Sequence, residues 1–266
     1  MSNLLGSFVH IQAVKRAVIS AANWVDLQWS VTISQLRKVA PRARGTLLDV
    51  GCGCKPYMSI FAPYVARYVG LELESTFSGT AAASLSVQPD VYYDGKRIPF
   101  DEESFDTVLS IQVLEHTPTP QELLNEMSRV LRRDGVLILS APFSFRLHEE
   151  PHDYFRYSPH GLRVMCEKAG LQVQEVWPQG SLWSVLGHQM NSFLAFQVGK
   201  LDGFTQSLGK LTHEETSNSS PRFLALPFVV PAMVLISGAA RVLDKVFPDR
   251  TMALGYLIIA NRPSKF

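Results

Sequence analysis

Two glycines in the segment Gly51-Cys52-Gly53 follow directly on a short apolar run, and Asp49 stands just before them. Glycine has no Cβ, so the backbone at this turn can approach a ligand closely. Glu72 lies about 20 residues further on, at the end of a second apolar run, where an acidic side chain can accept hydrogen bonds from both hydroxyls of a ribose. The pattern therefore predicts a crevice for a ribose-containing ligand.

The charge at this turn bears on which ligand fits. A dinucleotide site uses G-x-G-x-x-G, whose third glycine lets the helix pack closely under a pyrophosphate. Here Pro56 occupies the third position, and the Asp49 carboxylate would repel a pyrophosphate. A cationic ligand suits the site better, for example a sulfonium cofactor with a free amino group. A nicotinamide-dependent oxidoreductase is therefore the disfavoured alternative.

A second group of polar residues extends from residue 148 to residue 157. Histidine titrates near neutral pH and is the usual general base, so His152 and His116 are candidate catalytic residues together with Asp153. A structural role for His152 and Asp153 is an equal alternative, and His116 could simply help to open a helix. The aromatic residues Tyr154, Phe155 and Tyr157 are expected to pack in the core, because such rings bury a large area.

The cysteine content predicts neither a metal site nor a disulfide framework. Cys52 and Cys54 form a C-x-C pair, but no second ligand pair follows at the spacing of a zinc site. Three cysteines are also too few for a set of disulfides, which favours a reducing, cytoplasmic setting.

The overall composition restricts the class of protein. A chain of 266 residues with 46% apolar and 18% charged residues can bury one good core and is not expected to be disordered. Its 25 basic and 24 acidic residues give a net charge of +1, and no Lys/Arg run is present, so nucleic acid is not an expected partner. The N-terminal residues have no clean apolar core before a cleavage site, and we do not interpret them as a secretory signal.

The elements that must position these residues follow from hydrophobic periodicity and from glycine and proline punctuation. Strands and helices alternate along the chain, which predicts a parallel sheet with helices on both faces. The predicted strands are residues 46–50, 67–71, 91–94, 105–111, 136–140, 171–177 and 253–260. The predicted helices are one or two amphipathic helices in residues 1–40, then 56–65, 75–83, 120–131 and 158–169, with Gly170 as a C-cap.

The segment before the last strand is too long for a crossover connection and is interpreted as an insertion between strands six and seven. The predicted fold is thus α/β, a doubly wound, seven-stranded, mostly parallel sheet whose last strand is antiparallel, with helices on both faces and an apolar helical insertion. The expected parts are an N-terminal helical segment (1–44), the cofactor-binding Rossmann-like domain (45–177 and 250–266) and the insertion (178–249).

The insertion is the most apolar part of the chain. No charged residue occurs between Arg222 and Arg241, a stretch nearly long enough for a membrane span. Pro227 and Pro231 interrupt it, however, and a single crossing would separate the last strand from its sheet. We therefore expect an apolar lid, a homodimer surface or a shallow contact with a membrane surface. Each of these suits a substrate molecule with an apolar portion.

Five segments of the chain form a recognisable set: LLDVGCG from residue 47, VGLE from residue 69, DGKRIPFDEESFD from residue 94, VLEH from residue 113 and EMSRVLRRDGVL from residue 126. Together they resemble the small-molecule branch of the class I S-adenosylmethionine-dependent methyltransferases. The resemblance covers roughly residues 45–177 and the last strand.

The resemblance implies a role for each matching position. Asp49, Gly51 and Gly53 would line the methionine end of S-adenosylmethionine, and Glu72 would hold its ribose. Asp94 and the backbone of Gly95 would meet the adenine, and Ser110 to Gln112 would approach the sulfonium and the acceptor. Lys55 departs from the usually small residue of this loop and places a cation near the methionine carboxylate or points outward.

Two functions follow as expectations. The first is a methyltransferase that acts on an oxygen or carbon of a small molecule, which could be lipid-linked, glycan or polyketide-like. The second is a non-catalytic protein that binds S-adenosylmethionine and acts through its apolar insertion.

Overall fold

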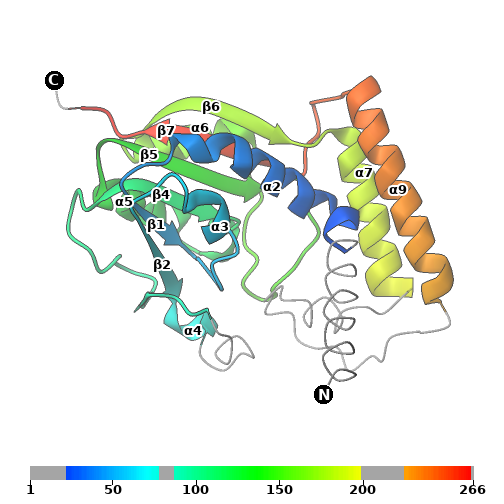
Figure 1. Ribbon diagram of the computed structural model, residues 1–266, viewed down its shortest axis with the longest axis horizontal. Helices are drawn as coiled ribbons and strands as arrows, with labels where there is room; N and C mark the ends of the chain where they lie inside the picture. Colours follow the sequence, from blue (N-terminus) through cyan, green and yellow to red (C-terminus); the bar gives the residue numbers. More distant parts are fainter. Residues whose placement is uncertain (1–21, 78–86, 199–224, 265–266) are drawn as a thin grey trace, which may run out of the picture. The chain divides into compact units, whose positions relative to one another are not determined.

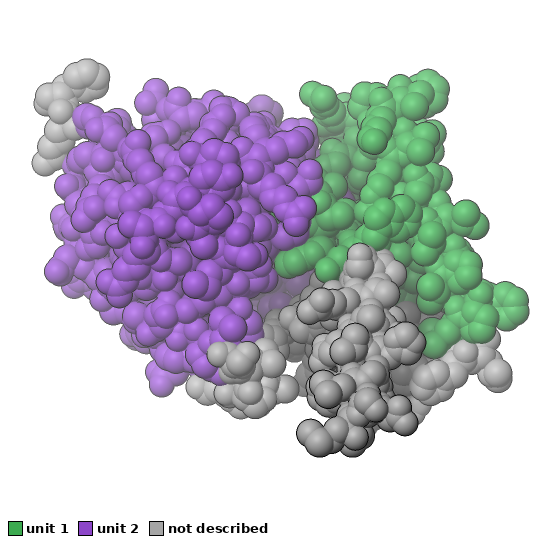
Figure 2. All heavy atoms as spheres, in the orientation of Figure 1, with its two compact units in different colours: residues 1–32, 180–210, 216–252 green, residues 33–179, 211–215, 253–266 purple. Residues whose placement is uncertain are grey.

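The computed structural model gives the structure of residues 22–77, 87–198 and 225–264. The chain divides into two compact units, which Figure 2 shows in different colours. One unit holds residues 33–179, 211–215 and 253–266, and the other holds residues 1–32, 180–210 and 216–252. The predicted division into three parts along the chain stays a prediction.

The larger unit is built on a seven-stranded sheet in the order β3-β2-β1-β4-β5-β7-β6. Strands β1 to β5 pair in parallel, and β7 lies antiparallel between β5 and β6. This confirms the predicted doubly wound sheet and its antiparallel last strand. The strands are β1 (Thr46–Val50), β2 (Arg67–Leu73), β3 (Val91–Tyr93), β4 (Phe105–Ile111), β5 (Leu131–Pro142), β6 (Gln172–Gln179) and β7 (Gly255–Asn261).

Alternate residues of each strand face opposite sides of the sheet, and helices cover both sides. Leu48 packs in one apolar cluster together with residues of α5 (Pro120–Val130) and α6 (Pro159–Lys168). Its neighbour Leu47 packs in a second cluster with residues of α2 (Leu27–Val39), η1 (Ala40–Arg42) and α3 (Met58–Phe61). The central strands are buried on both faces, as near-continuous apolar runs predict.

Several element bounds differ from the prediction. The helix expected over residues 56–65 is only the short α3, because Pro63 lacks the backbone N–H that a further turn needs. The strand expected over residues 136–140 is longer, because β5 already begins at Leu131 and shifts its register against β4 near that end. Helix α4 (Glu74–Phe77) covers the start of the helix expected over 75–83, and the rest of that range lies outside the described residues.

The smaller unit contains α7 (Leu182–Ser192), the π-helical segment η4 (Phe193–Val198) and α9 (Leu226–Val246), which lie between β6 and β7 in the chain as predicted. Gly187 allows α7 and α9 to approach closely, since a Cβ there would lie 2.9 Å from Ala240 Cβ. Asp244 of α9 accepts hydrogen bonds from the hydroxyls of Ser181 and Ser184. Polar bonds thus fix one end of the helix pair, and a glycine contact fixes its middle.

Pro227 and Pro231 do not interrupt α9 as the sequence suggested. Pro227 lies in the first turn, where the missing N–H costs no hydrogen bond, and the helix continues through Pro231. Among the described residues, α9 is the one helix that is long and apolar enough to cross a membrane, with a mean hydropathy of 1.9 and 17% of that stretch buried inside the protein. Its length and composition alone do not distinguish a span from a surface helix.

Candidate functional site

The turn after β1 is held against β2 by backbone hydrogen bonds. The amides of Gly51 and Cys52 both donate to the carbonyl of Leu71, at 2.9 and 3.1 Å. Gly51 has a φ of 73°, and an added Cβ would lie 2.5 Å from Val113 Cγ2, so both its conformation and its surroundings require glycine. Gly53 has a φ of 49°, but a Cβ there would meet no atom within 4 Å. There is therefore open space beside Gly53 that a ligand could occupy.

Asp49 is a buried carboxyl group at the end of β1. Its Oδ2 accepts a hydrogen bond of 2.5 Å from the hydroxyl of Tyr68 on β2, and its exposed fraction is 1%. Burial raises the pKa of Asp49 from 3.8 to about 7, the Tyr68 hydrogen bond opposes this rise, Glu72 adds to it and Lys55 reduces it. A cation placed next to Asp49 would restore its charge, which is the electrostatic preference expected of a site for a sulfonium or ammonium group.

Glu72 reaches from the end of β2 to the glycine turn. Its Oε2 accepts a hydrogen bond of 2.6 Å from the Gly53 amide, and its Oε1 accepts one of 2.9 Å from the Leu73 amide. The carboxylate is 7% exposed and so is largely withdrawn from water. Glu72 thus fixes the glycine loop against the end of β2.

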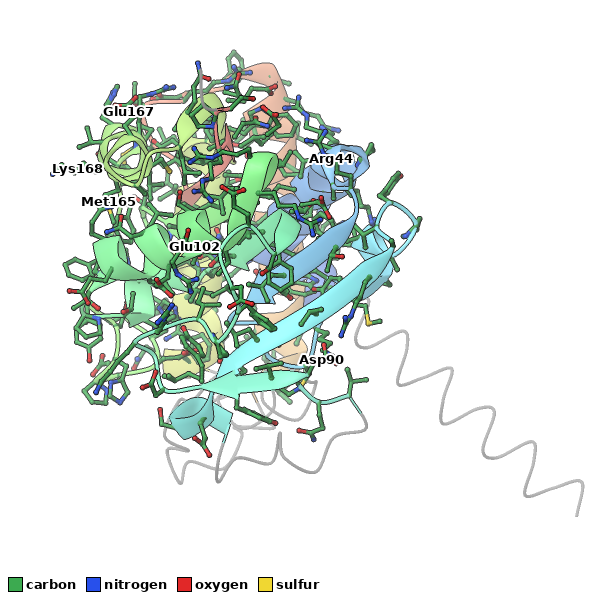
Figure 3. All side chains as sticks on the ribbon, turned by 90° about the vertical axis from the view of Figure 1, so that its left-hand side faces the viewer. Arg44, Asp90, Glu102, Met165, Glu167 and Lys168 are labelled. Carbon is green, nitrogen blue, oxygen red and sulfur yellow. The ribbon has the colours of Figure 1, made fainter. Side chains whose placement is uncertain are left out.

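The structure shows where Lys55 is directed. Its Nζ forms an ion pair of 2.7 Å with Asp90 Oδ2, just before β3, where Figure 3 labels Asp90. The Lys55 side chain is 7% exposed, and its Cε passes so close over Gly70 that a Cβ there would lie 2.6 Å away. Asp90 also accepts a hydrogen bond from the Gly70 amide. Lys55 therefore ties the glycine loop to the start of β3.

The other predicted cofactor residues lie at the ends of neighbouring strands. Asp94 and Gly95 follow β3, and Asp94 Oδ1 accepts a hydrogen bond from the Lys96 amide, which holds the pKa of Asp94 below its ordinary value. Gln112 follows β4, with a φ of 57°, and its Nε2 donates to Ser140 Oγ on β5 at 2.8 Å. The Gln112 side chain is thus directed toward β5.

These residues meet at one edge of the sheet. Because β1 to β4 are parallel and adjacent, their carboxyl ends lie together, and ligands in such folds bind where the order of strands reverses, here between β1 and β4. The seven predicted cofactor residues, Asp49, Gly51, Gly53, Glu72, Asp94, Gly95 and Gln112, all follow or end these four strands. The open space at Gly53 and the buried carboxylates fit an adenosyl cofactor with a cationic end.

A second polar cluster lies beyond the ends of β4 and β5. The turn η3 (Leu114–His116) follows β4, and the loop of residues 143–158 follows β5. Hydrogen bonds join the two segments, among them one of 2.8 Å from the Tyr157 hydroxyl to the Leu114 carbonyl and one of 2.8 Å from the Tyr154 amide to the Glu115 carbonyl. The loop is thereby fixed against the turn.

Asp153 is engaged by an arginine within this loop. Both of its oxygens accept hydrogen bonds from Arg156, at 2.5 and 2.6 Å, and Oδ2 also accepts the amide of His148. Although burial opposes it, these hydrogen bonds hold the pKa of Asp153 below its ordinary value. Arg156 in turn donates to the carbonyls of Phe145 and Arg146. This arrangement favours a positioning role for Asp153, one of the two alternatives that the sequence left open.

His116 and His148 lie side by side, with their rings in a T-shaped contact at 4.8 Å. The Nδ1 of His116 lies 2.9 Å from the carbonyl oxygen of His152, which can only accept, so Nδ1 carries the proton. Its Nε2 lies 3.8 Å from Glu115 Oε1 and 3.7 Å from Glu149 Oε2. Burial lowers the pKa of His116, and burial together with His116 lowers that of His148 to about 4, so both rings are neutral at pH 7.

Glu115 is completely buried, and its Oε1 lies 3.8 Å from His116 Nε2. Neither of its carboxylate oxygens has a hydrogen-bond partner among the described residues. Burial raises the pKa of Glu115 to about 8. From the sequence, Glu115 was placed only within the segment VLEH and His148 only within the polar segment 148–157, and neither was named as a candidate site residue. The signal that could have identified them is a Glu-His pair after one strand followed by a further histidine after the next strand.

The aromatic residues of the loop only partly follow the prediction. Tyr157 is buried, as expected, because its ring packs in the core and its hydroxyl reaches a backbone acceptor. Tyr154 and Phe155 are 43% and 39% exposed, so the expected core position is wrong for these two. His152 is also exposed, with Nδ1 3.1 Å from the Tyr154 hydroxyl.

The fold defines a class of protein, an α/β domain of the doubly wound type with a glycine turn where the order of its strands reverses. Solved structures share this fold. They include the [4+2]-cyclase SpnF, with a TM-score of 0.54 at 19% identity over 90% of this chain and 82% of the other. Phosphoethanolamine N-methyltransferase 2 of Haemonchus contortus, in complex with S-adenosylmethionine, gives 0.51 at 16% identity over 92% and 57%.

Sequence comparison identifies the domain more closely. Residues 48–139 match the family model described as a methyltransferase domain. An uncharacterized methyltransferase of Mycobacterium leprae is 35% identical over 103 residues, 38% of each chain. One of Mycobacterium tuberculosis is 33% identical over 126 residues, 47% of each chain, so the match spans less than half the length of these relatives. Residues 48–139 of this chain thus match a methyltransferase domain, on a fold that S-adenosylmethionine-dependent methyltransferases share.

Proposed function

We propose that the protein transfers a methyl group from S-adenosylmethionine to an oxygen or carbon atom of a small molecule with an apolar portion. The observation that carries this proposal is the buried Asp49 carboxyl group next to the open space at Gly53. Burial destabilises the ionised form of this carboxyl group in the free protein, and a cationic ligand stabilises that form by its opposite charge. The site therefore favours a cation over a neutral or anionic ligand.

The crevice residues would divide the work of holding the cofactor. Asp49 would face the cationic methionine end, Glu72 would accept the ribose hydroxyls, and Asp94 with the Gly95 backbone would contact the adenine. The bound cofactor supplies an electrophilic methyl group on sulfur. Transfer then needs little covalent help, because placing the acceptor atom at attack distance contributes several kcal/mol by itself.

The polar cluster beyond β4 and β5 is the proposed acceptor side of the site. His116 and His152 remain the candidates for a general base, and the pairing with Arg156 gives Asp153 a positioning role. The same loop exposes Leu147 by 64%, together with the rings of Tyr154 and Phe155. Exposed apolar side chains beside polar groups suit an acceptor that is partly apolar, such as a lipid-linked, glycan-linked or polyketide-like molecule.

Replacement of Glu72 tests the cofactor assignment. In Glu72→Ala we expect the affinity for S-adenosylhomocysteine, measured by calorimetry, to fall by about tenfold or more, because one charged acceptor of the ribose is worth about 1.5–3 kcal/mol. Glu175→Ala is a matched control, because Glu175 lies on β6, away from the glycine turn, where its carboxylate contacts Arg42 and Trp177. Equal affinity of Glu72→Ala and the unaltered chain would contradict the ribose assignment.

A protein that binds S-adenosylmethionine without turnover is the alternative function. The SpnF likeness shows only that this fold also serves a protein described as a cyclase, so fold does not decide the reaction. Incubation with methyl-labelled S-adenosylmethionine and extracts from hosts with and without the gene distinguishes the two. A labelled product supports methyl transfer, whereas tight cofactor binding with no product in any extract supports the alternative. Binding of NAD in place of S-adenosylmethionine would contradict both.

We also propose that the smaller unit makes a peripheral contact with a lipid surface. Phe228, Leu235 and Val242 of α9 recur every seven residues on one helix face and are 78%, 73% and 59% exposed. Such a stripe on a helix of high mean hydropathy is typical of interfacial helices.

A vesicle test decides between lipid and a second copy of the chain. We expect the protein to float with vesicles of phosphatidylcholine and phosphatidylglycerol, and Phe228→Ser/Leu235→Ser to lose this property. Asp101→Ser, an exposed change in the larger unit, is the control. A dimer in size-exclusion chromatography that the double variant abolishes, without vesicle binding, would assign the stripe to self-association.

A further inference from the structure

Three side chains beyond β4 and β5 form a group that the cofactor crevice does not use. Glu115, His116 and His148 each offer one ligand atom, and these atoms all lie within 4.8 Å of one another. The donors come from two different segments, the turn after β4 and the loop after β5. Two imidazole nitrogens and one carboxylate oxygen are a common donor set for divalent transition metals in enzymes.

The buried carboxylate is the feature that most needs an explanation. Both oxygens of Glu115 are buried, and neither has a hydrogen-bond partner among the described residues. A buried carboxyl group without a hydrogen-bond partner destabilises the fold, and native structures rarely keep one unless it binds an ion or a ligand. Here it lies against the basic nitrogen of His116, at 3.8 Å.

Both histidines are already arranged as metal ligands usually are. A metal-bound imidazole donates its other ring N–H to a carbonyl or carboxylate, which fixes the tautomer. His116 does so through Nδ1 to the carbonyl of His152 at 2.9 Å. The Nδ1 of His148 lies 3.3 Å from the Arg146 carbonyl and 3.3 Å from Asp153 Oδ2. In each ring Nε2 is therefore the nitrogen with the free lone pair.

The charge around the group also favours a cation. Glu149 and Asp153 bring two carboxylates, Glu115 brings a third carboxyl group that a bound cation would ionise, and Arg156 brings one positive charge that is committed to Asp153. Two imidazole nitrogens and this excess of carboxyl groups are a donor set for a divalent ion. Because two donors at about 2.1 Å from one ion are at most about 4.2 Å apart, the widest pair would close by about half an ångström on binding.

We propose that Glu115, His116 and His148 bind a divalent first-row transition-metal ion next to the acceptor side of the crevice. The ion would leave open positions for oxygen atoms, since three protein ligands do not fill its coordination sphere. Glu149, whose Oε2 lies 3.7 Å from His116 Nε2, stands where it can join the set.

The role of this ion rests on the proposed methyl transfer, with His116 as a ligand of the ion in place of a general base. An acceptor with two neighbouring oxygen atoms, such as a vicinal diol or a hydroxy-carbonyl group, would chelate it. Coordination lowers the pKa of an acceptor hydroxyl, whose proton passes to solvent. The oxygen-methyl bond then forms while the carbon-sulfur bond breaks, and its electron pair stays on sulfur as the thioether.

Binding of the ion is tested without any reaction. The purified chain is freed of metal with a chelator and titrated with Mn²⁺, followed by calorimetry and electron paramagnetic resonance. Mn²⁺ is chosen because thiolates such as those of Cys52 and Cys54 are poor ligands for it. We expect one ion per chain and an affinity lowered at least about tenfold in Glu115→Gln and in His148→Asn. His160→Gln, an exposed histidine on α6, should bind as the unaltered chain does.

The outcomes separate this inference from the proposed function. No Mn²⁺ binding by the unaltered chain, or equal affinity in both ligand variants, would overturn the metal site. Thermal unfolding of each variant shows that it is folded, and if Glu115→Gln fails to fold, His148→Asn alone decides. Titration with S-adenosylhomocysteine is run in parallel. Cofactor binding without metal binding refutes only the site, whereas metal binding without cofactor binding refutes only the methyltransferase proposal.

Discussion

The raised pKa of Asp49 predicts that cofactor binding depends on pH in a specific direction. In the free protein the pKa of this buried carboxyl group is about 7, whereas the ordinary pKa of an aspartic acid is 3.8. A bound ammonium or sulfonium group favours the ionised form and lowers this pKa. Below pH 7 the ligand therefore binds only after Asp49 has released its proton, so the affinity rises with pH and levels off above 7.

The size of the effect follows from the fraction of Asp49 that is ionised. With a pKa of about 7, this fraction grows about fifteenfold between pH 5.5 and pH 7, and so does the affinity if the bound carboxyl stays ionised throughout. The groups that face Asp49 are the Tyr68 hydroxyl, Glu72 and Lys55. Of these, the Tyr68 pKa is raised further still, so its hydroxyl keeps its proton in this range.

Calorimetry with S-adenosylhomocysteine at a series of pH values measures this directly. The ligand keeps a cationic amino group in this range, and the proton released on binding is detected by comparing buffers of different ionisation enthalpy. 5′-Methylthioadenosine, which lacks the amino acid portion, is the control ligand and should bind with the same affinity at pH 5.5 and pH 7. In Asp49→Asn the pH dependence for S-adenosylhomocysteine should disappear.

The same substitution has a second expected effect, on stability. The unfolded state ionises Asp49 near pH 3.8 and the folded state near pH 7, so the charge destabilises the free fold increasingly as pH rises between these values. At one pKa unit per 1.36 kcal/mol, Asp49→Asn should raise the free energy of unfolding by up to about 4 kcal/mol above pH 7 and by little at pH 3.5. The Asn side chain can still accept the Tyr68 hydrogen bond. A pH-independent affinity in the unaltered protein, or a dependence that survives in Asp49→Asn, would refute the reasoning.

Two further predictions concern the turn after β1 and the loop after β5. Gly51→Ala should lower the free energy of unfolding, measured in urea titrations, by about 2 kcal/mol or more, because Gly51 has a positive φ and an added Cβ would contact Val113. Gly53→Ala should lower it by about 1 kcal/mol and mainly weaken cofactor binding. Equal destabilisation by both substitutions would contradict the open space at Gly53. Tyr157→Phe should cost about 1–3 kcal/mol, since it leaves the buried Leu114 carbonyl without its donor, and an unchanged urea midpoint would show that this bond does not hold the loop.

The sequence alone was sufficient for the sheet and for the sheet edge at which the glycine turn and Glu72 lie. Apolar runs such as Thr46–Val50 and Phe105–Ile111 form strands because they are buried on both faces, and this is a property of the local pattern. The turn at Gly51 and the position of Glu72 follow from the same local signals. Bounds failed where a long-range partner decided, as in β5, which extends to Leu131 because that residue pairs with Phe105 of β4.

Only the tertiary structure decided the chemistry beyond β4 and β5. His116 and His152 are 36 positions apart and meet because β4 and β5 are neighbours in the sheet, which no local pattern specifies. The commitment of Asp153 to Arg156, the exposure of Tyr154 and the isolation of the Glu115 carboxylate depend in the same way on how the loop packs. Periodicity fixes which face of a strand or helix is buried, but the neighbours of a polar side chain, and hence its charge and its ligands, are set by contacts between segments distant in the chain.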